Sequence, residues 1–170
     1  MPQPGSVYGA TKAFTEHLAG ALAADYPECA LIGLRYGYVY GPGRERGWRD
    51  MQVMIEAAQR GETLIVFPDY PEAVDWTWID DAVEVTARTL TAPFANSRVF
   101  NVAGDKRRMR DAAEHLARHF PSIEFVPRPA VTPPSAWSFF NDGLFDAIGF
   151  IPQTTMEDGI DRCLGLRTLA

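Results

Sequence analysis

Two short apolar runs constrain the fold of this chain more than any other feature. Residues 30–34 (ALIGL) and 99–102 (VFNV) each follow a stretch with helical character, and each leads into a loop that contains glycine. Continuous runs of this length are typical of parallel strands that are buried on both faces. The sequence therefore predicts an α/β protein in which these two segments are central strands.

The segments around these runs alternate between helix and strand. A helix is expected from Ser6 to Asp25, because Ala10, Phe14, Leu18 and Leu22 recur at every fourth position and Ser6 is a suitable N-cap. Asp80 or Asp81 is expected to cap a later helix, and the proline-rich residues 127–134 are expected to cross the surface. Further helices are predicted over residues 50–60, 80–90, 108–119, 142–148 and 156–164, and strands over 64–67, 74–79 and 123–126. With only two central strands, the sheet looks incomplete.

Composition excludes several classes of function. The 170 residues fit one domain, and a net charge of −6 argues against non-specific nucleic-acid binding, which needs a basic surface. No apolar run approaches the roughly 20 residues that span a bilayer. Cys29 and Cys163 lie far apart, without the spacing of metal ligands, which favours a reducing, cytoplasmic compartment. His115 and His119 are four residues apart on a helix, a spacing that can bind a metal, but the sequence identifies no third ligand for them, so no metal site is predicted.

Tyr8 and Lys12 are the strongest candidates for catalysis. Their spacing places both side chains on one face of the first helix, one turn apart. A nearby ammonium group lowers the pKa of a phenol, by about 1–3 units, toward the range where proton transfer is useful. The same lysine could bind a ribose hydroxyl and hold a nicotinamide beside the phenol. The alternative is an exposed tyrosine beside a solvated lysine, and the pair alone does not exclude it.

Five blocks extend this pattern over nearly the whole chain. In order, they are residues 8–12 (YGATK), 34–43 (LRYGYVYGPG), 75–82 (DWTWIDDA), 99–104 (VFNVAG) and 148–160 (IGFIPQTTMEDGI). Together they resemble the extended short-chain dehydrogenase/reductases, the NAD-dependent epimerase/dehydratase family.

The resemblance implies a fold and a set of roles. Tyr8 would be the general acid/base, and Lys12 would lower its pKa and bind the nicotinamide ribose of NAD or NADP. The residues that would lie beside the nicotinamide or the substrate are Tyr36, Gly37, Tyr38 and Val39. The reaction would be oxidation, reduction or oxidation-linked epimerisation at a carbinol carbon of a sugar-like or small hydroxy substrate.

The resemblance also implies that part of the cofactor site lies outside this sequence. Family members hold the cofactor pyrophosphate with a glycine-rich G-x-x-G-x-x-G turn, and no such motif occurs in these 170 residues. The chain is therefore expected to be a partial domain that needs an N-terminal half-protein for activity, and a native-like homodimer is doubtful. Residues 1–47 and 75–105 would be the remaining Rossmann elements of a doubly wound parallel sheet, and 48–74 and 106–170 mainly a small substrate-binding lobe. The alternative is a non-catalytic remnant that binds a partner through its uncovered apolar surface.

Two departures from the family pattern bear on the substrate. Tyr38 and Val74 stand where sugar-nucleotide enzymes of the family usually carry an asparagine and a phosphate-binding arginine, which argues against a UDP- or dTDP-sugar. Arg44, Arg46 and Arg49 follow in the next loop and could bind an anionic group instead, or they could form a solvated loop.

Overall fold

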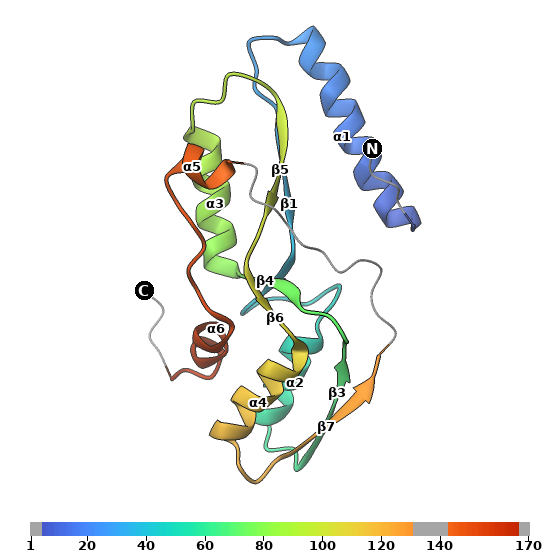
Figure 1. The fold of residues 1–170 in the computed structure, drawn as a ribbon, viewed down its shortest axis with the longest axis vertical. Helices are drawn as coiled ribbons and strands as arrows, with labels where there is room; N and C mark the ends of the chain where they lie inside the picture. Colours follow the sequence, from blue (N-terminus) through green and yellow to red (C-terminus); the bar gives the residue numbers. More distant parts are fainter. Residues whose placement is uncertain (1–4, 131–142, 167–170) are drawn as a thin grey trace.

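The structure is a computed structural model that describes residues 5–130 and 143–166. Its elements follow the predicted alternation of helix and strand (Figure 1). The helices are α1 (Val7–Asp25), α2 (Asp50–Gln59), α3 (Ile79–Thr91), α4 (Met109–His119), α5 (Leu144–Ile148) and α6 (Met156–Cys163). The strands are β1 (Ile32–Tyr36), β2 (Tyr38–Tyr40), β3 (Leu64–Asp69), β4 (Val74–Trp78), β5 (Arg98–Val102), β6 (Asp105–Arg107) and β7 (Glu124–Pro129).

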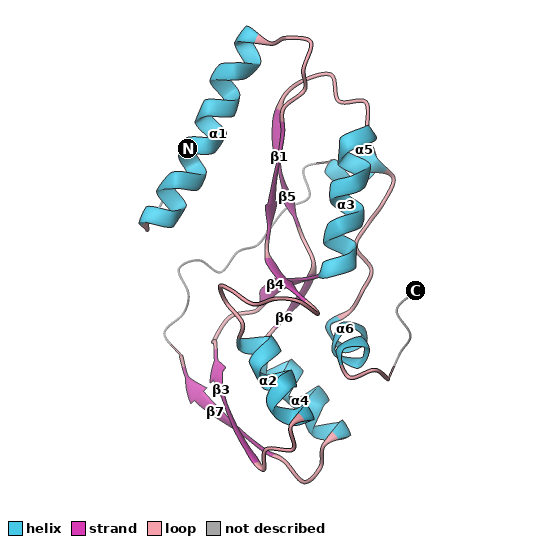
Figure 2. Ribbon diagram, turned by 180° about the vertical axis from the view of Figure 1, so that it is seen from behind, coloured by secondary structure: helices cyan, strands magenta, loops and turns pink. Residues whose placement is uncertain are grey.

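The two apolar runs form adjacent parallel strands, as predicted. β1 pairs with β5 from Ile32 opposite Arg98 to Tyr36 opposite Val102. Helices α3 and α5 cover one face of this pair, while α1 stands on the other side (Figure 2). A core of Val85, Phe100, Val102, Leu144, Phe145 and Ile148 fills the covered face. The expected burial on both faces is wrong for both strands. In β5 only Phe100 and Val102 are buried, and in β1 every residue is only partly buried because α1 does not pack closely against it.

The second part of the molecule has its own sheets and a larger core. β4 lies between β2, which is parallel to it, and the antiparallel β6, and β3 pairs in parallel with β7. Helices α2, α4 and α6 pack around these strands, with Trp78, Ile55 and Leu116 fully buried between them. The division into Rossmann elements and a substrate-binding lobe stays a prediction.

The prolines after residue 126 lie at the surface, as predicted, but they do so within a paired strand. Pro127 and Pro129 belong to β7, where they pair with Phe67 and Asp69 of β3. Proline has no backbone N–H to donate to a neighbouring strand. It is tolerated in β7 because β7 is an edge strand, paired with β3 on one side only. Residues 131–134 lie outside the described residues.

Asp80 and Asp81 do not cap α3, contrary to the prediction. The N-cap is Trp78, and both carboxylates lie within the first helical turn. Asp80 accepts a hydrogen bond from the Trp78 indole N–H at 2.8 Å, and Asp81 accepts one from the backbone N–H of Thr154 at 3.0 Å. Asp81 thus fastens the segment before α6 to α3. By contrast, Ser6 caps α1 as predicted, because its side chain accepts from the Gly9 N–H at 3.0 Å.

Helix α1 is the least integrated element. None of its residues is buried, and its predicted apolar ridge is exposed, with Phe14 at 66% and Leu18 and Leu22 also open to solvent. Its side chains reach the rest of the described structure through the ion pair of Glu16 with Arg35 of β1, in which Arg35 Nε donates to Glu16 at 2.6 Å. Within the described ranges, no helix combines the length and the apolar character needed to cross a membrane.

The Glu16–Arg35 pair makes the attachment of α1 depend on pH. The hydrogen bond from Arg35 lowers the pKa of Glu16 despite the opposing effect of burial. A carboxylate with a lowered folded-state pKa contributes stability above its unfolded value, about 4.3, and loses it as the pH falls through the folded-state value. We expect acidification through the lowered folded-state pKa of Glu16 to reduce the protection factors of the α1 amide hydrogens, measured relative to their intrinsic exchange rates, before it reduces those of β5. Because the pair is partly exposed, its contribution is small, about 0.5–1 kcal/mol.

Glu16→Gln is the matched test of this attachment. At neutral pH it should lower the α1 protection factors toward the values that the parent protein shows in acid. The protection factors of the variant should then change little in α1 when the pH is lowered. Equal α1 exchange in the two proteins at neutral pH would show that the ion pair does not hold the helix.

Candidate active site

The α1 helix brings Tyr8 and Lys12 together on one exposed face. The Lys12 Nζ lies 5.4 Å from the centroid of the Tyr8 ring, above its face, and Tyr8 is 72% exposed. The ammonium therefore sits over the ring rather than at the phenol oxygen. The flexible four-carbon stem of lysine allows either position. The pair is positioned as the sequence predicts, and its catalytic role stays a prediction.

The loop after β1 and the loop after β5 lie at the same edge of the sheet, because Tyr36 and Val102 are register partners. Ligands of open α/β sheets bind at this carboxyl edge. Tyr36 itself is anchored to α3, since its hydroxyl donates to the Ala82 carbonyl at 2.9 Å and lies 2.6 Å from Thr86 Oγ1. Burial raises the pKa of Tyr36. Tyr36 is thus held in place as a neutral phenol, and Gly37, Tyr38 and Val39 continue toward β4.

Tyr38 belongs to a row of aromatic rings. It stacks on Trp48 with 5.1 Å between ring centroids, and it packs against Trp76 of β4 at 5.4 Å. Trp48 in turn stacks on Tyr70 at 5.3 Å. Trp76 is buried, whereas Trp48 is 40% exposed. Sequence reasoning did not identify Trp48 or Tyr70, because neither lies in a recognisable motif.

Arg44 and Arg49 are drawn into the protein. Arg44 donates to the Val39 carbonyl, and Arg49 donates to Glu56 at 3.1 Å. Nevertheless, the Nε of each guanidinium is buried and has no hydrogen-bond partner among the described residues. Burial lowers the pKa of Arg44, and the charge of Arg49 lowers it further. Buried donors without acceptors are costly and bind anions readily. Arg46 is exposed, and the choice between anion binding and a solvated loop stays a prediction for all three arginines.

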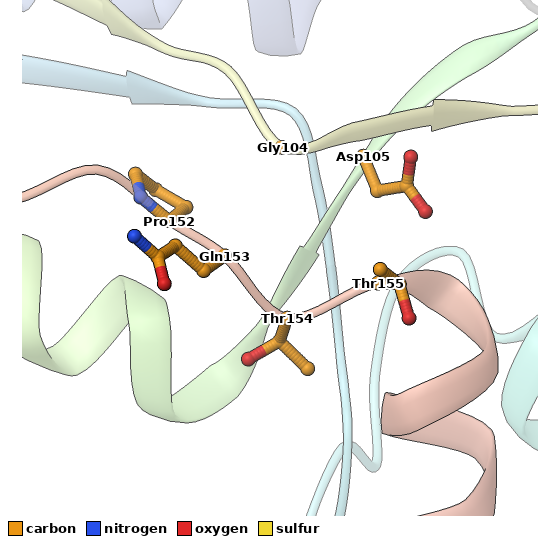
Figure 3. Close-up of a pocket in the computed structure, with 6 residues that line it drawn as sticks. All are labelled: Gly104, Asp105, Pro152, Gln153, Thr154 and Thr155. Carbon is orange, nitrogen blue, oxygen red and sulfur yellow. The ribbon is translucent and has the colours of Figure 1, made fainter.

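A cavity of about 220 Å³ opens beside the carboxyl end of β5 (Figure 3). Its walls are Gly104, Asp105, Pro152, Gln153, Thr154 and Thr155. Asp105 accepts from the backbone N–H of Met156 at 2.8 Å, which holds the start of α6 against this cavity. A Cβ on Gly104, which lies between β5 and β6, would stand 2.1 Å from the Trp76 carbonyl oxygen, so only glycine permits this approach of the β5–β6 connection to β4. These residues come from distant parts of the sequence, and the sequence predictions did not combine them.

Comparison with known proteins connects this arrangement to one family. Residues 1–103 match the pattern of the NAD dependent epimerase/dehydratase family. The chain is 29% identical to the dTDP-L-rhamnose 4-epimerase of Burkholderia thailandensis, in a match that covers 94% of this chain and 45% of that protein. RMD from Pseudomonas aeruginosa, solved with NADPH, is 20% identical and superimposes with a TM-score of 0.81 over 97% of this chain and 57% of its own.

A further solved structure, MoeE5 in complex with UDP-glucose and NAD, is 25% identical with a TM-score of 0.79, over 97% of this chain and 56% of that one. The chain thus spans about half the length of the proteins it matches. The fold neighbours confirm the α/β, Rossmann-type architecture that the sequence predicted. Since the family pattern covers more than half of the chain, including the Tyr8–Lys12 pair and both strands of the β1–β5 sheet, the chain belongs to the NAD dependent epimerase/dehydratase family.

Proposed function

We propose that the protein containing this chain oxidises, reduces or epimerises a carbinol carbon of a sugar that carries an anionic group, with NAD or NADP as hydride carrier. The observation that carries this proposal is the Tyr8–Lys12 pair on one face of α1. Family membership supports it, because the matched region includes both residues.

In this proposal Tyr8 moves the proton. Its phenolate takes the proton of the substrate hydroxyl as the carbinol is oxidised, and its phenol returns a proton when a carbonyl is reduced. Lys12 stabilises the phenolate through its positive charge, which makes this exchange possible near neutral pH. The bound nicotinamide supplies hydride acceptor and donor chemistry.

The residues of this chain fit only one end of the cofactor. Lys12 has an exposed ammonium that can donate to ribose hydroxyl groups, and the backbone at Gly37 offers a surface at the carboxyl edge of β1. The sequence contains no glycine-rich turn that would bind a pyrophosphate. We therefore assign the pyrophosphate site to another polypeptide segment, an N-terminal half-protein.

The exposed apolar face of α1 supports such a partner. Phe14, Leu18 and Leu22 form a ridge on a helix without buried residues, and β1 is only partly buried behind it. An apolar ridge of this kind marks a contact surface. The same surface also suits the second candidate, a non-catalytic domain that binds a protein partner, so activity must distinguish the two.

Arg44 and Arg49 are assigned to the anionic group of the substrate. Their buried Nε atoms lack acceptors among the described residues. MoeE5 binds UDP-glucose, and the Burkholderia relative is named for a dTDP-sugar, so nucleotide sugars are the first substrates to test. Val74, which cannot pair with phosphate, makes these arginines the alternative anion site.

Arg44→Gln tests this assignment. Removing a charged hydrogen-bond donor costs about 1.5–3 kcal/mol, so KM for the anionic sugar should rise roughly 10- to 100-fold while kcat changes little. Arg46→Gln removes the same charge from an exposed neighbouring position and should behave like the parent protein. Equal KM values in the two variants would remove Arg44 from substrate binding.

Turnover tests the function itself. The chain, combined with the N-terminal half-protein proposed to supply the pyrophosphate site, is assayed with NAD or NADP and nucleotide sugars, following the sugar product. Turnover that requires the nicotinamide supports the proposal. Absence of any turnover, together with tight binding of a polypeptide through the α1 ridge, would favour the non-catalytic candidate.

A further inference from the structure

Two histidines and an aspartate converge where α4 meets α6, away from the candidate active site. His115 and His119 lie one turn apart on α4, and Asp161 comes from α6. The His115 Nε2 lies 2.6 Å from Asp161 Oδ1, the His119 Nε2 lies 3.1 Å from the same oxygen, and the two Nε2 atoms are 3.3 Å apart. All three groups thus point at one small volume. His115 is 7% exposed, whereas His119 is partly open to solvent.

The cluster joins two elements that the sequence analysis treated separately. The spacing of the histidines alone carried no metal prediction, because the sequence does not identify the residue that completes the cluster. The packing of α6 against α4 supplies the missing carboxylate. The protein has only three histidines, and two of them are in this cluster.

The arrangement has the dimensions of a metal site. A tetrahedral zinc ion binds imidazole nitrogen and carboxylate oxygen at about 2.0–2.2 Å, which places neighbouring ligand atoms roughly 3.3 Å apart. The distance between the two Nε2 atoms equals this separation, and that between His119 and Asp161 is close to it. Only the distance between His115 Nε2 and Asp161 Oδ1, now 2.6 Å, must increase to admit an ion, and it must do so by less than about 1 Å. We propose that His115, His119 and Asp161 bind a divalent transition-metal ion of the zinc class, with a fourth position open to water.

Arg118 competes with this ion in the described structure. One of its terminal nitrogens lies 2.8 Å from His115 Nδ1 and must donate to it, since a guanidinium has no acceptor. In that state the proton of neutral His115 resides on Nε2 and is donated to Asp161. Metal binding requires the opposite tautomer, with Nε2 bound to the ion and the proton on Nδ1. Arg118 is exposed and can move away from His115. Metal binding therefore replaces the hydrogen bond from Arg118 to His115 Nδ1 by a bond from His115 Nε2 to the ion.

The proposed ion would stabilise the lobe rather than take part in hydride transfer. It would cross-link α4 to α6, and these helices lie at the far end of the molecule from α1 (Figure 1). The proposal is therefore independent of the proposed function. An ion that binds only the folded state raises the thermal midpoint of unfolding.

Zinc chloride is the probe, added to the full chain after treatment with a chelator. At about a hundredfold excess over Kd, we expect Tm to rise by roughly 5–10 °C, and EDTA to reverse the rise. Cobalt(II) in its place should give the visible absorption of a tetrahedral site. His119→Ala, at a partly exposed position, should weaken zinc binding by more than about 100-fold. Asp161→Asn, measured by the same titration, should also weaken it.

His17→Ala is the matched control, because it removes the one remaining histidine from exposed α1 and should leave the zinc response unchanged. Arg118→Ala should bind zinc more tightly than the parent chain, since His115 Nδ1 is freed to carry its proton. No Tm rise with zinc in the parent chain would overturn the proposal. A rise that survives His119→Ala, or one that disappears in His17→Ala, would overturn it too.

Discussion

Replacing Tyr8 by phenylalanine is expected to reduce kcat of the whole protein by about 10³-fold or more, while the affinity for NAD or NADP stays nearly unchanged. The substitution removes one oxygen from an exposed ring on α1, so it should change the stability of the fold very little. It removes the group that exchanges a proton with the substrate, and general acid–base catalysis contributes about 10²–10⁴-fold. Steady-state kinetics and cofactor titration measure the two effects separately.

Tyr26→Phe is the control for this experiment. Tyr26 ends the same helix and is also exposed, but it lies far along α1 from Lys12. It should retain full activity. If Tyr8→Phe keeps more than about a tenth of the parent kcat, Tyr8 is not the acid/base, and the exposed tyrosine beside a solvated lysine becomes the better description.

Gly104→Ala is expected to have the largest effect on stability. The added Cβ would lie 2.1 Å from the Trp76 carbonyl oxygen and 2.7 Å from Thr77 Oγ1. Because the nearest atom belongs to the backbone of β4, relief requires the strands to separate. Overpacking of this kind costs about 3 kcal/mol. Chemical denaturation should show this loss, and the cavity beside Asp105 should change shape with it.

Gly20→Ala provides the matched control for the same change of side chain. Gly20 lies within α1, and nothing stands within 4 Å of the position that its Cβ would take. Alanine has a higher helix propensity than glycine. The variant should therefore gain about 0.5–1 kcal/mol in the free energy of unfolding, or leave the denaturation midpoint unchanged. A Gly104→Ala protein as stable as Gly20→Ala would mean that the start of β6 does not approach β4 as described.

Features set by local sequence were predictable. The apolar runs at Ile32 and Val99 specified two strands, and their parallel pairing follows from the helices between them. The spacing of Tyr8 and Lys12 specified a shared helical face, and the Ser6 side chain specified the start of α1. In each case the signal lies within a few residues of the feature that it determines.

Features set by distant contacts were not predictable from the sequence alone. Asp80 and Asp81 looked like helix caps, but their partners are an indole on the preceding strand and a backbone N–H of Thr154. Asp161 joins His115 only through the packing of α6 on α4. The burial of Arg44 depends on the fold of its loop, which no periodicity describes. Likewise, β1 lacks its second covering layer because α1 makes so few contacts with it.

The central claim is that a phenol and an ammonium on α1 serve hydride transfer, and rapid mixing tests it most directly. The whole protein, loaded with oxidised cofactor, is mixed with a nucleotide sugar while the near-ultraviolet absorbance of the reduced nicotinamide is followed. We predict a transient of reduced cofactor in the parent protein and none in Tyr8→Phe, with equal amounts of cofactor bound to both. A transient of the same rate and size in the two proteins would contradict the claim.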